Sequence, residues 1–170
     1  MPPNIKNCPI ALPLSKLSKL NSVKFIAVHC SASSPKSPNI GVKEIDLMHK
    51  GRGFACVGYH FVIKRNGEIE RGRPINTIGS HIVGYNSVSL GICMVGGLDE
   101  RGQPINNFTP EQFASLKSLL SYLHQMHPAA IIQGHRDFSP DKNHDGKITQ
   151  SEWLKACPCF DVKQWLEQNK

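Results

Sequence analysis

Short apolar runs rich in β-branched and aromatic residues recur along the chain, at lengths typical of buried strands. The clearest run covers residues 23–28 and ends directly before His29. The pair Asn66-Gly67 lies between two further runs, and it favours a tight hairpin because both turn positions adopt positive φ. The pattern predicts strands over residues 23–28, 59–64, 68–72, 89–95 and 130–133.

Apolar positions at helical spacing predict three helices between these strands. The longest begins at Thr109, which forms a capping box with Gln112, and it ends before Pro128. A shorter helix is predicted over residues 42–50, and a last one begins after Asp161. Strands that alternate with helices predict an α/β fold with a central mixed β-sheet flanked by helices.

A length of 170 residues favours a single domain. All the predicted elements lie within residues 23–170, so residues 1–22 are expected to form a flexible N-terminal arm. Pro9 and Pro13 interrupt the short apolar stretch of this arm, and no small-residue cleavage site follows, so we expect no signal peptide. No run approaches the roughly 18 apolar residues of a membrane span, so we expect no stable membrane insertion.

The net charge and the cysteines indicate which partners and which cellular compartment to expect. A formal net charge of +7 favours anionic partners, such as nucleic acid, anionic lipid or a bacterial envelope. No run of like charges or aromatic-basic stripe supports nucleic-acid binding, so we expect none. Of the six cysteines, Cys30 and Cys93 lie in apolar strand-like segments, where a free thiol behaves as a small hydrophobe. We therefore expect reduced cysteines and synthesis in a reducing compartment.

Three residues could form a metal site. His29 and His135 follow predicted central strands, and Cys157 lies in a short loop. Side chains from separate segments converge at strand ends in α/β sheets, and two imidazoles with one thiolate suit tetrahedral zinc with an open fourth position. Spacing alone does not select these three from eight histidines and six cysteines, and a single histidine at a strand end is more often structural.

Five local motifs single these three residues out. In chain order they are Val28-His29-Cys30-Ser31-Ala32, Gly58-Tyr59-His60-Phe61-Val62-Ile63, Val95-Gly96-Gly97, Gly134-His135-Arg136 and Lys155-Ala156-Cys157-Pro158. Over residues 23–170, the chain with these motifs resembles the type 2 N-acetylmuramoyl-L-alanine amidases, and in particular the small phage lysozymes of the amidase type. The peptidoglycan recognition proteins share that fold.

The resemblance implies a role for each matching position. It places the zinc ligands on His29, His135 and Cys157, and two further catalytic residues on Tyr59 and Lys155. A tyrosine can orient water or pass protons, and a lysine can stabilise the oxyanion that develops on the amide carbonyl. Without the resemblance, Tyr59 would be an ordinary strand aromatic and Lys155 a solvated charge.

The segments Ser80-His81 and Gly84-Tyr85-Asn86 also resemble the substrate cleft of the family. They place His81 and Asn86 near the glycopeptide, and His49 is a further candidate for the substrate site. His60 alternates with Tyr59 along the predicted strand, so its side chain is expected to face the other way.

The implied activity is zinc-dependent hydrolysis of the amide between N-acetylmuramic acid and L-alanine in bacterial peptidoglycan. The protein is then a monomeric phage-type endolysin, made in the host cytoplasm and acting on the cell wall after release. One alternative is a cytosolic amidase that recycles muropeptides, although those relatives usually carry aspartate as the third ligand. Another is a non-catalytic peptidoglycan-binding module, although such proteins typically lose the cysteine, which is present here as Cys157.

Residues 141–152 depart from the small phage relatives, whose connection is much shorter. They match the twelve-residue calcium loop of the EF-hand, with Gly146 at the sharp turn. Pro140 leaves no room for the usual entering helix, whereas residues 152–155 look helical. A merely polar acidic loop is the alternative to a structural calcium site. The calcium ligands would be Asp141, Asn143, Asp145, the Lys147 carbonyl, Thr149 and Glu152.

Overall fold

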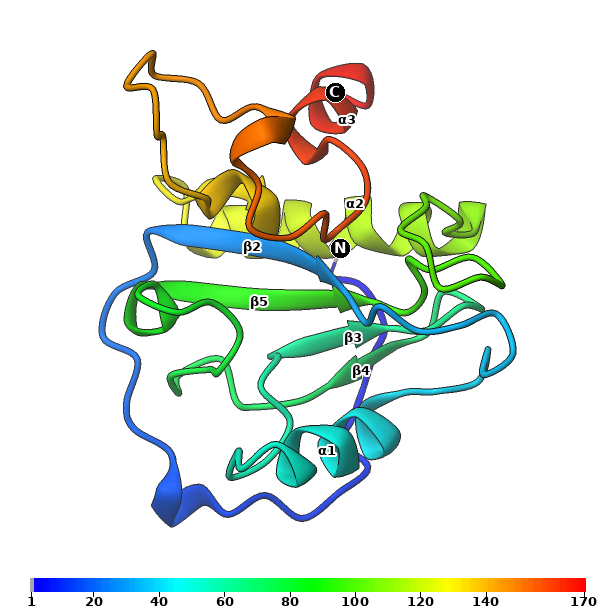
Figure 1. Ribbon diagram of the computed structural model, residues 1–170. Coiled ribbons are helices and arrows are strands. Elements are labelled where there is room, and N and C mark those ends of the chain that lie inside the picture. The colour runs from blue at the N-terminus through cyan, green and yellow to red at the C-terminus, as the bar shows by residue number, and fades with distance from the viewer. Residues whose placement is uncertain (1) are drawn as a thin grey trace.

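The computed structural model describes residues 2–170, and it confirms the α/β class with a central mixed sheet (Figure 1). The six strands lie in the order β1-β4-β3-β5-β2-β6. β3 and β4 are antiparallel, and the other neighbours are parallel. In chain order the elements are β1 (Ile5–Lys6), η1 (Leu14–Lys16), β2 (Phe25–Cys30), α1 (Val42–Gly51), β3 (Phe61–Ile63), β4 (Ile69–Arg71), η2 (Asn86–Val88), β5 (Ser89–Met94), α2 (Pro110–Met126), β6 (Ile131–Gly134), η3 (His135–Phe138), η4 (Gln150–Glu152) and α3 (Val162–Gln168).

Helices cover both faces of the sheet (Figure 1). The larger core lies under α2 and α3, where Leu116, Leu119 and Leu123 of α2 are fully buried against the strands. The smaller core lies under α1, around Val42 and Ile45. The sheet is thus covered on both faces, as expected for strands that are mostly parallel.

The long helix begins as its sequence predicts. The Thr109 hydroxyl accepts the Gln112 amide at 3.1 Å, and the Gln112 side chain accepts the Thr109 amide at 3.0 Å. The Gln112 side chain is buried, and it donates to the carbonyls of Ile63 and Val95 at 3.1 and 2.9 Å. This cap therefore also fastens the start of α2 to the ends of β3 and β5.

The N-terminal segment is part of the sheet rather than a free arm. Ile5 and Lys6 pair in parallel with Ile69 and Glu70, which adds β1 at the sheet edge. Further along, Leu20 is 7% exposed and packs into the larger core. The strand was missed because its two residues give too short a pattern to detect along the sequence.

His60 and Tyr59 have different neighbours: the His60 ring lies beside His81, and the Tyr59 ring lies beside His29 and His49. β3 begins only at Phe61, and the opposite direction of the two side chains stays a prediction. His60 is fully buried, accepts the Gly91 amide at 3.0 Å through Nδ1 and donates from Nε2 to the Thr77 carbonyl at 2.8 Å. It therefore joins β5 to the loop after β4.

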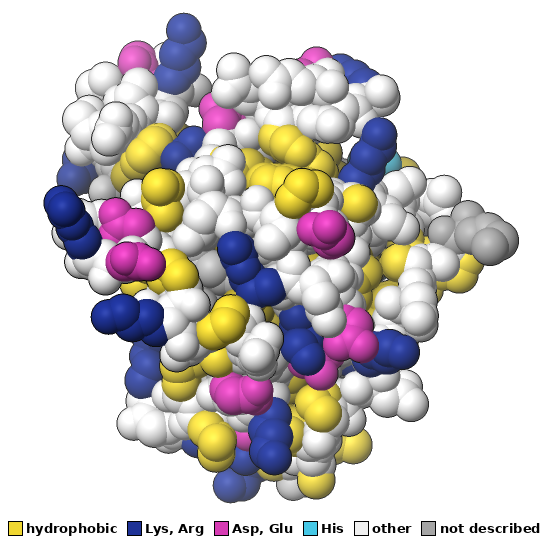
Figure 2. Space-filling model, turned by 90° about the vertical axis from the view of Figure 1, so that its right-hand side faces the viewer, with side chains coloured by type: hydrophobic (Ala, Val, Ile, Leu, Met, Phe, Trp, Pro, Cys, Tyr) yellow, Lys and Arg dark blue, Asp and Glu magenta, His cyan; other side chains and the backbone are white. Residues whose placement is uncertain are grey.

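The surface carries mixed charge. On the face that Figure 2 shows, lysine and arginine side chains are interspersed with aspartate and glutamate rather than gathered into one patch. Within residues 2–170, no helix combines the length and apolar character needed to span a bilayer.

The buried His60 makes stability depend on pH. Burial lowers the pKa of His60 from 6.5 to about 4. The unfolded chain therefore binds more protons than the folded one below pH 6.5, so this contribution is complete above pH 6.5 and is lost as the pH falls toward 4. A depression of this size is worth roughly 3 kcal/mol at most.

Urea unfolding between pH 7 and pH 4 should accordingly show a falling free energy of unfolding. His60→Gln keeps a donor near the Thr77 carbonyl and should make this pH dependence shallower, whereas the exposed His124→Gln should leave it unchanged. Equal slopes in wild type and His60→Gln would contradict the assignment.

Candidate active site

The structure brings the three predicted metal ligands together. His29 lies in β2, His135 is the first residue after β6, and Cys157 lies in the loop before α3. Their ligand atoms all lie within 4.8 Å of one another, and the two Nδ1 atoms of the histidines are 3.2 Å apart. His29 sits inside the strand rather than just past it, so its side chain is 1% exposed.

The two histidines are in the protonation state that metal binding requires. Burial, then the neighbouring His81 and His135, lower the pKa of His29 well below 6.5. Burial and the Lys155 charge lower the pKa of His135 to about 4. Both rings are therefore neutral at physiological pH and have a nitrogen lone pair to offer. Two neutral imidazoles and a thiol in one group fit a zinc ion.

The sulfur of Cys157 has a fixed place. The Cys30 amide donates to the Cys157 sulfur at 3.1 Å, and the Arg136 amide donates to the Cys157 carbonyl at 2.8 Å. These two hydrogen bonds hold the sulfur beside the end of β2. Nothing in the sequence indicated that the Cys30 amide contacts Cys157. The Cys30 side chain is part of the larger core. All six cysteines are free thiols, as expected.

Tyr59 and Lys155 lie in different surroundings near these three residues. The Tyr59 ring lies beside His29, with centroids 5.1 Å apart. Burial first, and then nearby cysteines, raise the pKa of Tyr59 well above 10, so its hydroxyl stays protonated. Lys155 is exposed, and its charge lowers the pKa of both His29 and His135.

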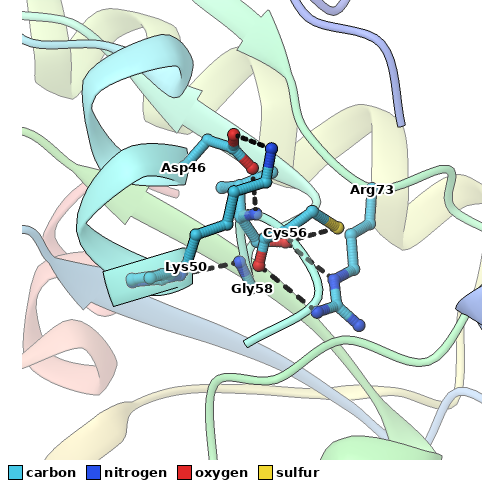
Figure 3. A network of polar contacts seen from close by, with 7 residues as sticks. Asp46, Lys50, Cys56, Gly58 and Arg73 are labelled. Atoms are coloured by element: carbon cyan, nitrogen blue, oxygen red, sulfur yellow. Dashed lines mark hydrogen bonds and ion pairs between the residues drawn. The ribbon is translucent and has the colours of Figure 1, made fainter. Parts of the chain in front are cut away.

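A polar network holds the segment that leads into Tyr59 (Figure 3). Asp46 of α1 accepts the Val57 amide at 2.7 Å and pairs with Lys50 at 2.9 Å. Arg73 donates to the Val57 carbonyl at 2.7 Å and to the Cys56 carbonyl at 3.4 Å. The motifs gave no sign of these residues, because Asp46 and Arg73 act on backbone atoms far away in sequence.

The three predicted substrate residues have partners inside the protein. His49 is 6% exposed and accepts the Gly58 amide at 2.8 Å, and burial lowers its pKa to about 4. The Asn86 side chain accepts the amides of His81 and Ile82, both at 2.8 Å. His81 contacts His29, with 2.9 Å between the Nδ1 and Nε2 atoms. Contact of these three with substrate stays a prediction.

The insertion folds into a tight loop between the ligands His135 and Cys157. Asp141 accepts the Gly146 amide at 2.8 Å, and His144 and Gly146 have φ values of 59° and 79°. The Glu152 carboxylate accepts backbone amides at both ends of the loop, from Lys142 and Thr149. Within residues 2–170, His29, His135 and Cys157 form the only close group of possible metal ligands, so the loop carboxylates do not converge in the same way.

The helix expected after this loop is absent. The ordered turn is η4, which ends at Glu152, and Trp153 adopts an extended backbone with ψ of 126°. Trp153 instead lies under the Arg136 guanidinium, 3.9 Å from the ring centroid. The stacking draws the chain back toward the end of β6, which is where Lys155 and Cys157 are needed.

Known proteins with the same pattern identify the family. A family model described as N-acetylmuramoyl-L-alanine amidase matches residues 19–152, ending before Lys155 and Cys157. The chain is 42% identical over 155 residues to an endolysin of Klebsiella phage KP32, covering 91% of this chain and 93% of that protein.

Solved structures agree. The endolysin N-acetylmuramoyl-L-alanine amidase LysCS of Clostridium intestinale superposes with a TM-score of 0.76 at 27% identity, covering 99% of this chain and 96% of that one. Bumblebee PGRP-SA shares the fold, with a TM-score of 0.73 at 15% identity and coverage of 97% and 94%. The chain belongs to the N-acetylmuramoyl-L-alanine amidase family.

Proposed function

We propose that this protein is a phage-type endolysin that hydrolyses the amide between N-acetylmuramic acid and L-alanine in bacterial peptidoglycan, with zinc held by His29, His135 and Cys157. Family membership and similarity to a phage endolysin support the reaction and its substrate. The observation that carries the metal is the group of two imidazoles and one sulfur within 4.8 Å. Zinc with three protein ligands lowers the pKa of a bound water to about 7, which supplies a nucleophile at neutral pH.

Side chains around the three proposed ligands supply the other groups that catalysis and substrate binding need. The protonated Tyr59 hydroxyl, on the ring beside His29, can donate a hydrogen bond that orients the attacking water. Lys155 brings a positive charge to the exposed side of the group, where negative charge develops on the amide carbonyl oxygen. His49, whose ring lies beside Tyr59, and Asn86, which accepts the His81 amide, border the same region, and their contact with the glycopeptide is part of the proposal.

Two alternatives are less well supported. A recycling amidase would carry aspartate where this chain has Cys157, and a non-catalytic binding module would lack that ligand. Here the Cys157 sulfur is present and accepts a hydrogen bond from the Cys30 amide. We further propose that the protein acts as a monomer on the cell wall after release from the host cytoplasm.

Digestion of purified sacculi tests the reaction. Mass spectrometry should find peptides with a free N-terminal L-alanine and glycan strands that retain the lactyl group. Cys157→Ser removes the thiolate and should abolish release while the fold persists, whereas Cys8→Ser, far from the site in sequence, should behave as wild type. Cleavage at a glycosidic or peptide–peptide bond would rule out the reaction, and full turnover in Cys157→Ser would rule out the ligand.

Lys155→Ala should retain zinc but lose rate. Removing one group that stabilises the developing oxyanion typically costs on the order of 10² to 10³ in kcat. Steady-state kinetics on a soluble muropeptide, with zinc content checked by atomic absorption, measures this loss. The exposed Lys163→Ala on α3 is the matched control. A raised KM with unchanged kcat would instead make Lys155 a substrate-binding residue.

We also propose that residues 141–152 bind calcium as a structural ion. The sequence meets the pattern of the EF-hand loop, with oxygen donors at Asp141, Asn143, Asp145, Lys147, Thr149 and Glu152. The folded loop already has its sharp turn at Gly146. Calcium would neutralise the carboxylates and draw Glu152 away from the backbone amides that now donate hydrogen bonds to it.

Calcium should stabilise the protein and support catalysis. Glu152 precedes Lys155 by three residues and Cys157 by five, so an ordered loop restrains the segment that carries both. A ligand that binds only the folded state adds about 2.7 kcal/mol at 100-fold its Kd. Melting temperature and turnover, measured with zinc saturating, should rise on adding calcium to the chelated protein.

Variants separate calcium binding from the charge of the loop. Asp141→Ala and Glu152→Ala should melt at the temperature of the chelated protein and not respond to calcium, while Glu100→Ala, an exposed control, should respond like wild type. If calcium shifts neither melting nor turnover in the wild-type protein, the loop is a passive surface insertion.

A further inference from the structure

A line of buried polar groups runs inward from His29 through His81 and Ser89 to the Tyr85 carbonyl. Ser89 is fully buried, and its Oγ lies 2.8 Å from the Tyr85 carbonyl oxygen and 3.2 Å from Nε2 of His81. A carbonyl can only accept, so the single hydroxyl proton of Ser89 points to Tyr85. The contact with His81 must therefore be donated by the imidazole, which places the His81 proton on Nε2.

The proton position on His81 decides that on His29. With its proton on Nε2, a neutral His81 ring has a bare Nδ1 that can only accept. This Nδ1 lies 2.9 Å from Nε2 of His29, so His29 must donate from Nε2. The Nδ1 atom of His29 is then bare, and it is the atom that faces Nδ1 of His135 at 3.2 Å.

Two glycines fix the His81 ring in this line. A β-carbon on Gly91 of β5 would lie 2.8 Å from the ring atoms of His81, and one on Gly79 would lie 2.7 Å from them. His60 closes another side, with ring centroids 5.8 Å apart. The ring therefore fills a slot that exists only because two backbone positions carry no side chain.

We propose that Ser89 and His81 are positioning residues that hold His29 as its Nε2–H tautomer, so that Nδ1 is ready to bind the metal. The inference rests on His29 as a metal ligand in the proposed function. Partners of this kind orient a ligand ring and typically account for 10- to 100-fold in metal affinity. His81 thus acts through His29 rather than on the glycopeptide.

Nitrogen NMR of the histidine-labelled protein tests this without any substitution. Long-range proton–nitrogen spectra should show His29 and His81 protonated at Nε2, both in the metal-free protein and after zinc is added. An Nδ1–H tautomer at His29 or His81 in the metal-free protein would overturn the proposal.

Zinc affinity provides the second test. By competition with a chromophoric chelator, His81→Phe should bind zinc roughly 10- to 100-fold more weakly, since the ring is kept but the acceptor is lost. His81→Asn keeps an acceptor near Nδ1 and should recover most of the affinity. Ser89→Ala should show a smaller loss in the same direction. Ser87→Ala and His124→Phe, both at exposed positions, should match wild type.

The readouts separate this role from a role in substrate binding. Melting of the metal-free variants checks the fold, and with zinc saturating, KM should stay within twofold of wild type. Unchanged zinc affinity in folded His81→Phe, or in Ser89→Ala if the former does not fold, would overturn the proposal, as would a rise in KM alone. Because the NMR and zinc-affinity assays need no hydrolysis, a chain that binds zinc as described but does not cut peptidoglycan would refute only the proposed reaction.

Discussion

The register of β2 against its two parallel neighbours is the constraint on which the site depends. Val28 pairs with Gly134, so His29 and His135 leave the same edge of the sheet side by side. Strand side chains alternate between faces, and a slip of one residue would send His29 into the opposite core. Gly134 contributes as well, because a β-carbon there would lie 2.8 Å from the Pro158 ring, which follows the third ligand. One pairing thus positions all three donors.

Around this edge the protein buries polar groups, and most of them have partners. His29 and His60 are buried and His81 is partly buried, and burial lowers the pKa of each ring, which keeps it neutral. Buried polar groups are costly when unpaired and rigid when paired. Asp46 and Arg73 hold the backbone that leads into Tyr59 (Figure 3). The site is therefore held in place by polar groups whose partners lie inside the protein.

The insertion takes up much of the connection between the second and third ligands. It leaves the sheet after η3 and returns at Cys157, and Figure 1 shows it as a loop that extends away from the strands. A long excursion at this point costs loop-closure entropy. The Arg136–Trp153 stack and the amides capped by Glu152 offset part of that cost, because they tie the excursion to itself and to the end of β6. Residues 141–152 therefore lie in the connection between two of the three candidate metal ligands.

The amino-acid sequence by itself determined the elements with strong local signals and the candidate chemistry. The capping box at Thr109, the buried run before His29 and the motifs around Tyr59, His135 and Cys157 all depend on neighbours within a few residues. These local signals can be interpreted without knowledge of the fold. The class of fold follows from them, because alternating strands and helices have few ways to bury their apolar faces.

Tertiary structure alone decided which groups act on one another across long separations. Two residues at Ile5–Lys6 became a strand only because β4 offers a partner. His81 contacts His29, 52 residues away, because its ring fits a slot left by Gly79 and Gly91. Such contacts depend on distance and direction between segments that share no local pattern. The proton order in the line from Ser89 to His29 has the same origin, since it exists only where donors and acceptors meet in space.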